Sequence, residues 1–360
     1  MGVADPILLV VRGLDPVGTG RQVELAAGGL AAVGRPVAVA ITTTGGSLPA
    51  RLELSGIPVH RLGGRPVGDI AATMRLIDLI RRLRPAAIIG FGRSEAVRVA
   101  IARRFGGRAG AIGWVGLGPA GRRQAWHMRG LDRLVATSPE VATAWQRARL
   151  AGGRITVVPP GSDPDAGSGV DRGELAARLG LDPQRQWTLA VAPLEPAARL
   201  PRLLWAIDQL GVVRNDLQHV LVGAGPLREL LWRRARAQEL ADRLTVLPDC
   251  ELLPDLLGQV RLVWQSGEVA VGGAILDGMV RGLPAVAVQS DTAGQLIEDD
   301  GSGLIVRTVP ESEFPRAAFR ILEDDSLARR YGEAGRARAT EHFPAGTFVA
   351  GLLATVEAGR

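Results

Sequence analysis

The sequence predicts two successive domains, each a doubly wound parallel α/β sheet, with a cleft between them. Short apolar runs of strand length alternate with longer stretches of helical periodicity in both halves of the chain, as in parallel sheets covered by helices. A stretch of proline, glycine and short polar residues, 159–171, interrupts this alternation before it restarts. The 360 residues also exceed what one hydrophobic core usually holds.

The first half begins with a buried strand, because the run 7–11 is continuously apolar and stops before Arg12. A glycine-containing loop, 13–20, then leads into a helix that Gly34 ends. The expected strands are 7–11, 37–41, 59–62, 87–89, 111–115, 133–136 and 155–158. The expected helices are 21–33, 48–55, 74–83, 95–105 and 139–149, with a basic stretch at 121–129.

The second half repeats the pattern after the break. The expected strands are 188–192, 219–222, 244–247, 262–264, 285–288 and 304–306. The expected helices are 200–210, 227–239, 252–257, 312–323, 325–341 and 345–357. These elements divide the chain into a first domain, a linker, a second domain and a C-terminal helix expected to pack back on the first domain: 1–160, 161–185, 186–343 and 344–360.

The chain is organised around 261–288, which predicts a strand, a glycine-rich loop, a helix that ends at Gly282 and a further strand. Gly272 and Gly273 would expose backbone N–H groups at the helix N-terminus, where a phosphate is favoured. Glu268 and Asp277 would bring carboxylates to the same rim. A tight turn with ordinary surface acids is the alternative interpretation.

Composition excludes several classes of function. The single cysteine, Cys250, allows no intrachain disulfide and no cysteine-based metal site, and it suits a reducing compartment. No apolar run has the length of a signal peptide or a membrane span, so a cytoplasmic protein is expected. Lysine is absent, which excludes lysine Schiff-base chemistry.

The charge is unevenly distributed. Residues 1–160 carry 22 arginines against 9 acids, whereas residues 161–360 carry 21 arginines against 28 acids. The basic first half predicts an anionic partner, such as a phospholipid surface or a lipid-linked phosphate. Nucleic acid is not expected, because the tryptophans of this half are not interleaved with arginines in a stacking pattern. An arginine-rich solvated face is the alternative.

Five segments of the second half, in the correct order, resemble the family 4 glycosyltransferases. They are 157–163 (VVPPGSD), 219–230 (HVLVGAGPLREL), 276–284 (LDGMVRGLP), 296–305 (LIEDDGSGLI) and 321–334 (ILEDDSLARRYGEA). In the first half, 18–23 (GTGRQV) stands where the family has its first glycine-rich loop. The resemblance implies the GT-B fold, two Rossmann-like domains facing a cleft. It implies a retaining transfer of a sugar from a nucleotide-diphosphate sugar to a glycan, lipid or small-molecule acceptor.

The resemblance also implies roles for individual residues. Glu268 and Arg199 would be catalytic. Glu268 would act at the sugar, and Arg199 would neutralise the charge of the leaving diphosphate. The donor would bind Gly223, Gly225, Pro226, Leu227, Pro248, Gly272, Gly273, Ala274, Ile275 and Asp277, the last of these through the ribose hydroxyls. Gly18, Thr19 and Gly20 would form an acceptor or diphosphate loop. Neither a metal ion nor a cofactor is expected beside the nucleotide sugar.

The chain departs from the family at the residues that perform the chemistry. Pro193 and Ala198 stand where the family has an arginine and a lysine, and Val269 stands where the first of two paired glutamates would fall. No histidine follows the strand at 111–115, where the family usually has one. A transferase-like fold without turnover, serving as a binding or scaffolding protein, is therefore the second hypothesis. A nucleotide-sugar epimerase is a third, disfavoured by the four scattered histidines.

Overall fold

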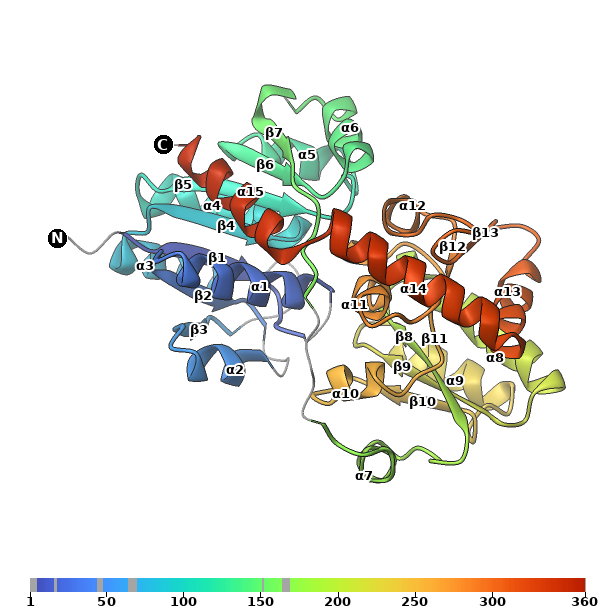
Figure 1. Ribbon diagram of the computed structural model, residues 1–360. Coiled ribbons are helices and arrows are strands. Elements are labelled where there is room, and N and C mark those ends of the chain that lie inside the picture. Colours follow the sequence, from blue (N-terminus) through green and yellow to red (C-terminus); the bar gives the residue numbers. More distant parts are fainter. Residues whose placement is uncertain are drawn as a thin grey trace. The chain divides into compact units, whose positions relative to one another are not determined.

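The computed structural model describes residues 5–15, 18–43, 48–63, 70–150, 152–163 and 169–359. The chain divides into two compact units (Figure 1). Unit 1 holds Met1–Gly161 and Phe343–Arg360, and unit 2 holds Ser162–His342. Each unit is a parallel sheet with helices packed on it, which confirms the predicted fold class.

Unit 1 contains a seven-stranded sheet in the order β3-β2-β1-β4-β5-β6-β7, with every pair parallel. The strands are β1 Ile7–Val11, β2 Val37–Ile41, β3 Val59–Arg61, β4 Ala87–Phe91, β5 Gly110–Val115, β6 Arg133–Ala136 and β7 Ile155–Val157. The helices are α1 Gly18–Ala32, α2 Leu48–Leu54, α3 Ile70–Leu83, α4 Arg93–Gly106, α5 Arg122–Met128, α6 Pro139–Arg147 and α15 Ala345–Glu357, with a 3-10 turn at Gly152–Arg154.

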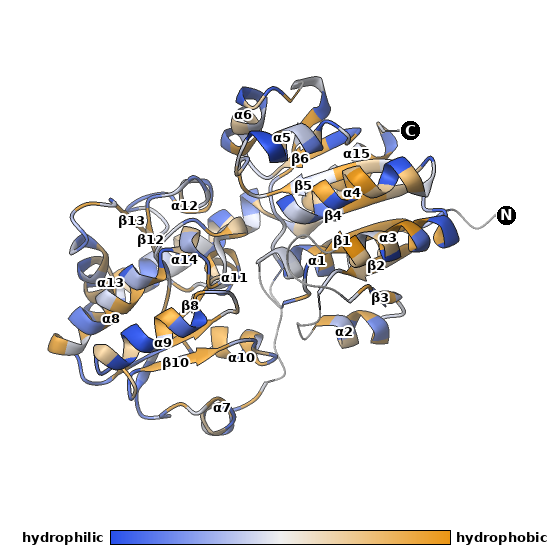
Figure 2. Ribbon diagram, turned by 180° about the vertical axis from the view of Figure 1, so that it is seen from behind, coloured by the Kyte–Doolittle hydropathy of each residue, from blue (hydrophilic) through white to orange (hydrophobic). Residues whose placement is uncertain are grey.

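The strand order of unit 1 reverses between β1 and β4, because the chain builds β2 and β3 on one side of β1 and β4 to β7 on the other. Helix α15 packs against α1 on one face of the sheet (Figure 1). Helices α3 and α4 cover the opposite face, which Figure 2 shows, and α5 packs against α4. Such a reversal is where open α/β sheets bind ligands, at the carboxyl ends of the strands.

Unit 2 contains a six-stranded parallel sheet in the order β10-β9-β8-β11-β12-β13, which reverses between β8 and β11. The strands are β8 Gln186–Val191, β9 Leu217–Val222, β10 Leu244–Leu247, β11 Leu262–Gln265, β12 Ala285–Val288 and β13 Leu304–Val306. The helices are α7 Arg172–Leu179, α8 Leu200–Val213, α9 Arg228–Ala237, α10 Leu253–Leu257, α11 Ile275–Val280, α12 Asp291–Leu296, α13 Glu313–Glu323 and α14 Asp325–His342, with 3-10 turns η2 Pro196–Ala198 and η3 Ala270–Gly272.

Each described strand lies within two residues of its prediction, but α5, α7 and α12 were not predicted. Helix α7 lies inside the stretch expected as a linker. It carries its own signals, an N-cap at Asp171 that accepts hydrogen bonds from the N–H groups of Gly173 and Glu174, and a left-handed Gly180 at its end. Residues 164–168 of the expected linker, and 16–17 of the first glycine-containing loop, lie outside the described residues.

Candidate functional site

The candidate donor site of unit 2 lies at the carboxyl ends of β8, β9 and β11, where the strand order reverses. The loops after β8 and β9 are joined by backbone hydrogen bonds. Ala192 donates to the carbonyl of Val222 (3.1 Å), and Leu194 donates to that of Ala224 (2.9 Å). Leu227, the residue before α9, donates in turn to the carbonyl of Leu194 (3.0 Å). The predicted loop after β9 is thereby fixed over the end of β8.

Two glycines make this close crossing of backbones feasible. A Cβ on Gly223 would lie 1.9 Å from the carbonyl oxygen of Ala192, and one on Gly225 would lie 2.6 Å from that of Leu194. No side chain fits at such distances, so both positions require glycine for close approach. Pro226, beside them, is exposed.

The loop after β11 is joined to the turn η2 that continues the β8 loop. The Ser266 hydroxyl donates to the carbonyl of Ala198 (2.7 Å), and the Glu268 N–H donates to that of Ala197 (2.9 Å). A Cβ on Gly267 would lie 2.4 Å from the Ala197 oxygen. The two glycine-containing loops of the predicted site, after β9 and after β11, therefore meet the loop after β8 at one place in unit 2.

Two arginines near this place differ in what they contact. Arg199 adopts a left-handed conformation (φ 48°) between η2 and α8, is exposed, and makes no hydrogen bond or ion pair with its side chain among the described residues. Arg202 donates through Nη2 to the carbonyl of Thr308 (3.1 Å) and pairs with Glu311 (3.2 Å). The Nε and Nη1 of Arg202 are buried without a hydrogen-bond partner among the described residues, whereas the Arg199 side chain is exposed.

The carboxylate of Glu268 holds the beginning of α12. It accepts hydrogen bonds from the N–H of Asp291 (3.1 Å), from the N–H of Thr292 (3.4 Å) and from the Thr292 hydroxyl. A carboxylate at a helix N-terminus is favoured by the unpaired N–H groups and the helix dipole. This predicted catalytic acid therefore organises the loop after β11 in the structure.

The glycine-rich loop contains three consecutive left-handed residues, Val271, Gly272 and Gly273, with φ of 58°, 71° and 57°. Val271 is β-branched and buried, so its conformation is strained by about 1–3 kcal/mol. A Cβ on Gly273 would lie 2.1 Å from the carbonyl oxygen of Val191, at the end of β8. The loop is thus held against β8 by three residues of positive φ, a conformation that only glycine adopts freely. Two of the three positions are glycine.

The remaining predicted donor residues lie on neighbouring elements. Ala274 precedes α11, Ile275 begins it, and Asp277 lies in its first turn; all three are buried, with Asp277 9% exposed. Val269, at the position of the family's first paired glutamate, is also buried. Pro248 is exposed after β10, two strands away from β8 in the sheet.

In unit 1, the predicted glycine loop is shorter than expected. Helix α1 begins at Gly18, so Gly18, Thr19 and Gly20 form its first turn instead of a loop. Gly20 packs directly on the backbone of Asp15, where a Cβ would lie 2.2 Å from the carbonyl oxygen, so this position requires glycine. The three residues still follow β1, at the carboxyl edge where the strand order reverses.

An acid that the sequence did not single out lies at the same edge of unit 1. Glu95, after β4, is buried and accepts a hydrogen bond from the Thr42 hydroxyl (3.1 Å). Burial raises the pKa of this carboxyl, although the Thr42 hydroxyl and the charges of Arg98 and Arg12 act in the opposite direction. Its only sequence signal is an acid shortly after a strand and a glycine.

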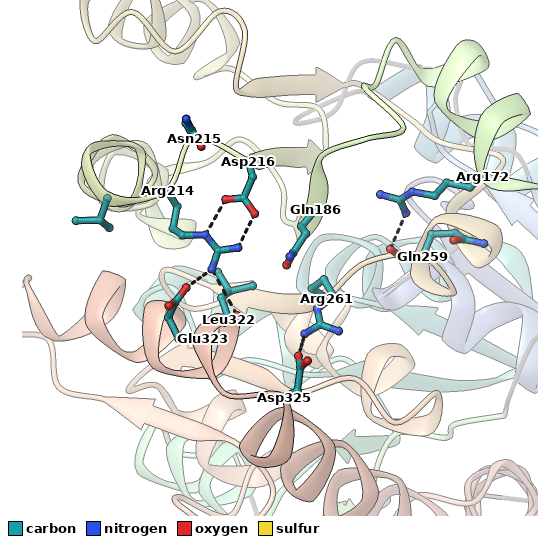
Figure 3. Close-up of a pocket in the computed structure, with 11 residues that line it drawn as sticks. Arg172, Gln186, Arg214, Asn215, Asp216, Gln259, Arg261, Leu322, Glu323 and Asp325 are labelled. Atoms are coloured by element: carbon teal, nitrogen blue, oxygen red, sulfur yellow. Dashed lines mark hydrogen bonds and ion pairs between the residues drawn. The ribbon is translucent and has the colours of Figure 1, made fainter.

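A hollow of about 740 Å³ lies at the amino ends of β8, β9 and β11, the ends opposite to the candidate site (Figure 3). It contains none of the predicted site residues. Its charged groups are paired with one another or with backbone: Arg214 contacts Asp216 and Glu323, and Arg261 contacts Asp325. The hollow is therefore lined by an ion-pair network that joins the α8–β9 turn to α13 and α14.

Within the described ranges, no helix combines the length and apolar character needed to cross a bilayer. The same part of the chain contains no group of three or more His, Cys, Asp or Glu side chains placed to hold a metal ion.

Two family models match the chain, one in each half. The model described as glycosyltransferase family 4 matches residues 16–166, and the model described as glycosyl transferases group 1 matches residues 171–338. The second match contains the three loops at the end of β8.

Curated relatives are similar over part of the chain. An alpha-D-kanosaminyltransferase of Streptomyces kanamyceticus is 31% identical over 172 residues, which cover 47% of this chain and 44% of the relative. A D-inositol 3-phosphate glycosyltransferase of Streptomyces bingchenggensis is 28% identical over 227 residues, 59% of this chain and 50% of the relative. The chain thus spans about half the length of these relatives.

Solved structures match nearly the whole fold. HepE of Anabaena, in complex with UDP and glucose, has a TM-score of 0.80 at 19% identity and covers 98% of this chain and 99% of its own. The sucrose-phosphate synthase of Thermosynechococcus elongatus has a TM-score of 0.76 at 18% identity and covers 99% and 100%.

Proposed function

The chain belongs to the family 4-like glycosyltransferases of the GT-B fold, and we propose that it transfers a sugar from a nucleotide-diphosphate sugar to a hydroxyl-bearing acceptor, with retention at the anomeric carbon. The donor binds in unit 2 and the acceptor in unit 1. Uridine diphosphate is the nucleotide to test first, because the similar HepE structure holds UDP.

The observation that carries the proposal is the meeting of two glycine-containing loops, after β9 and after β11, with the loop that follows β8. Gly223, Gly225, Gly267 and Gly273 each bring one backbone within contact of another where no Cβ fits. The N–H groups of Gly223 and Gly273 donate to the carbonyls of Leu247 (2.8 Å) and Ala270 (3.4 Å), so those of Gly225 and Gly267 are the ones proposed to face a diphosphate. The strand-order reversal places these loops where α/β sheets bind nucleotides.

Arg199 supplies the positive charge in this proposal. Cleavage of the bond between the sugar and the diphosphate leaves negative charge on the diphosphate, and a cation placed there stabilises the transition state. Arg199 is exposed, has no side-chain partner among the described residues, and follows the η2 turn to which the β11 loop is joined. Arg202 suits this role less, because its side chain is only 9% exposed and its Nη2 already contacts Thr308 and Glu311.

The two carboxylates of the site have different roles in this proposal, because one binds the donor and the other orients the loop after β11. Asp277 accepts the ribose hydroxyls of the donor, a role that a short carboxylate can fill as well as a glutamate. Glu268 orients the loop through its contacts with Asp291 and Thr292. Its further role as a catalytic group at the sugar stays a prediction.

The test compares nucleotide fragments by calorimetry in wild-type protein and in Arg199→Ala and Asp277→Asn. Because Arg199 would contact only the diphosphate, Arg199→Ala should weaken UDP binding at least about tenfold and leave uridine binding unchanged. Asp277→Asn should weaken UDP and uridine equally. The control Arg233→Ala removes an exposed arginine of α9 that pairs loosely with Glu229 (3.8 Å).

Three results would count against the donor site. The first is that wild-type protein shows no saturable binding of UDP, GDP or ADP. The second is that Arg199→Ala loses as much affinity for uridine as for UDP. The third is that the control loses as much UDP affinity as Arg199→Ala. Binding without transfer to any acceptor favours the second candidate function below.

A binding or scaffolding protein without turnover is the second candidate. Three uncharged residues favour it, because they stand where the family has charged ones. Ala198 is fully buried, Val269 is buried, and Pro193 carries no charge. This candidate keeps the nucleotide site and loses the chemical step. Hydrolysis of UDP-glucose, or its transfer to any acceptor, by purified protein excludes it.

We also propose that unit 1 contacts an anionic membrane from the cytoplasmic side, through the layer formed by α3, α4 and α5 (Figure 2). This layer exposes Met74, Phe105 and Trp126, each more than half accessible. The same helices and the residue after α5 carry exposed arginines: Arg75, Arg81, Arg82, Arg104, Arg122, Arg123 and Arg129. Apolar side chains among arginines suit the interface of an anionic bilayer. A lipid-linked acceptor would be reached from there.

Cosedimentation with vesicles tests this contact. The protein should bind phosphatidylglycerol vesicles, fail to bind phosphatidylcholine vesicles, and dissociate as salt screens the arginines. Trp126→Ala with Arg122→Gln and Arg123→Gln should remove binding, whereas Trp232→Ala, an exposed tryptophan of unit 2, should not. Equal binding to both vesicle types would contradict the proposal.

A further inference from the structure

The carboxyl group of Glu95 occupies the place in unit 1 where the strand order reverses. The side chain belongs to the first turn of α4, directly after β4, and only 3% of the residue is exposed. Oε1 accepts a hydrogen bond from the hydroxyl of Thr42 (3.1 Å), which follows β2 and is 1% exposed. Residues that follow β2 and β4, the strands on either side of β1, thus fix one carboxylate oxygen.

The second carboxylate oxygen faces an opening. Gly92, between β4 and α4, has a φ of 92° that only glycine adopts freely. Apart from the residues next to it in the chain, a Cβ built on Gly92 would have only Glu95 Oε2, at 3.7 Å, within 4 Å among the described residues. The glycine therefore leaves room for at least a methyl group beside this oxygen, and any other residue would fill that room.

The backbone holds the carboxyl in this position. A Cβ on Gly90, the penultimate residue of β4, would lie 2.7 Å from the backbone of Glu95, so the first turn of α4 rests directly on the strand. Such contact leaves little freedom for the Glu95 backbone. The geometry is that of a fixed group at the bottom of a small opening.

An acid at this place is not needed for packing. The residues that follow it in α4 and belong to the core, Ala96, Val99 and Ala100, are apolar and almost fully buried. Burying a carboxylate costs free energy unless every oxygen is paired, and a neutral side chain of similar size would avoid that cost. Desolvation accordingly raises the pKa of Glu95, despite the charges of Arg98 and Arg12 nearby.

We infer that Glu95 binds the acceptor in unit 1, with Oε2 accepting a hydrogen bond from an acceptor hydroxyl that enters the opening above Gly92. The ligand class is a sugar or polyol, because a carboxylate oxygen accepts from a hydroxyl and repels a phosphate. This inference rests on the proposed function. Thr42 keeps the carboxyl turned toward the opening and acts as a positioning residue.

The experiment measures UDP affinity, turnover of UDP-glucose with glycerol and methyl glucoside supplied as acceptors, and melting temperature at pH 8. It compares wild type with Glu95→Gln, Thr42→Val and the control Glu140→Gln, which alters an exposed acid of α6. Glu95→Gln should keep UDP affinity within about twofold and raise the acceptor KM at least about tenfold. It should also raise the melting temperature by about 2–4 °C, because the desolvation cost is removed. Thr42→Val should raise the same KM by a smaller factor.

A lower melting temperature in Glu95→Gln with an unchanged acceptor KM would overturn the inference, because the acid would then be structural. Where neither probe is used as an acceptor, the melting temperature alone decides. A higher melting temperature in Glu95→Gln supports a carboxyl kept for a ligand, and a lower one overturns the inference. Absence of UDP binding in wild type would defeat the proposed donor site and would be seen separately from either result.

Discussion

His219 shows how a single buried group couples unit 2 to pH. It lies in β9, fully surrounded by the core, with Nδ1 at 2.7 Å from the Thr188 hydroxyl and its ring beside Trp264 at a centroid distance of 5.4 Å. Burial lowers the pKa of His219 to about 3, so the imidazole is neutral in the folded protein. On unfolding it regains an ordinary pKa of about 6.5.

The stability of unit 2 should therefore fall as pH decreases. Between about pH 6.5 and pH 3 the unfolded chain binds a proton that the folded chain does not, so the contribution of His219 is complete above pH 6.5 and is lost below it. Urea unfolding across this range should show a loss of a few kcal/mol that His219→Gln largely abolishes. The control His342→Gln, at an exposed histidine of α14, should keep the wild-type profile. Parallel profiles for wild type and His219→Gln would contradict this prediction.

Arg214 gives a second prediction at this scale, on stability alone. Its guanidinium donates to both carboxylate oxygens of Asp216 (2.7 and 2.6 Å) and also contacts Glu323, and its side chain is 15% exposed. Arg214→Met should lower the free energy of unfolding by about 1–2 kcal/mol, because two charge-assisted contacts are lost from a largely buried cation.

Arg233→Met is the matched control for Arg214. Its pair with Glu229 is long (3.8 Å) and both side chains are highly exposed, so its loss should cost less than about 0.5 kcal/mol. Equal losses of unfolding free energy in the two variants, measured by urea unfolding, would contradict this prediction. They would show that the ion pairs around the hollow of Figure 3 stabilise the protein no more than an exposed pair does.

At the scale of elements, the loops after β9 and β11 could be predicted because their requirement for glycine is local. Gly223, Gly225 and Gly273 are needed where one backbone touches another, and the sequence shows such glycines directly after apolar runs. The partner of Glu268 could not be predicted, because Thr292 lies on a six-residue helix whose only strong signal is the cap at Ser290. The contact of Glu95 with Thr42 depends on β2 and β4 flanking β1 in the sheet, which no local pattern states.

Gly273→Ala tests the loop as an element. The new Cβ would meet the Val191 carbonyl at 2.1 Å in a left-handed conformation, so the loop must move away from β8. UDP affinity should fall at least about tenfold, by calorimetry, with a lower melting temperature. Gly294→Ala in α12, where nothing lies within 4 Å, should leave UDP affinity unchanged and stabilise by up to about 1 kcal/mol. An unchanged UDP affinity in Gly273→Ala would show that this loop is not part of the nucleotide site.

At the scale of the whole molecule, the residues of unit 2 form one continuous stretch, whereas unit 1 takes its residues from two stretches. The second stretch supplies α15, whose Phe348 and Leu352 are buried. Phe348 lies edge-on to Trp114 at a centroid distance of 6.4 Å and packs on Gly161. The charge asymmetry read from the sequence follows the same division, with the exposed arginines of α3 to α5 in unit 1.

Truncation of the α15 core contact should affect unit 1 alone. Phe348→Ala should cost about 3–5 kcal/mol and increase hydrogen exchange in β1 to β6, while β8 to β12 keep their protection. Leu353→Ala, a half-buried neighbour in the same helix, should cost much less. A uniform increase of exchange in all strands would show that the two units unfold as one.

The discontinuity of unit 1 has a consequence for biosynthesis. As the nascent chain leaves the ribosome, β1 to β7 emerge first, but α15, which covers α1 and contacts Trp114, emerges only after the whole of unit 2. Unit 2 can complete its core while translation continues, whereas the apolar surface that α15 covers must wait. The unit whose residues are translated first is therefore the last to be completed.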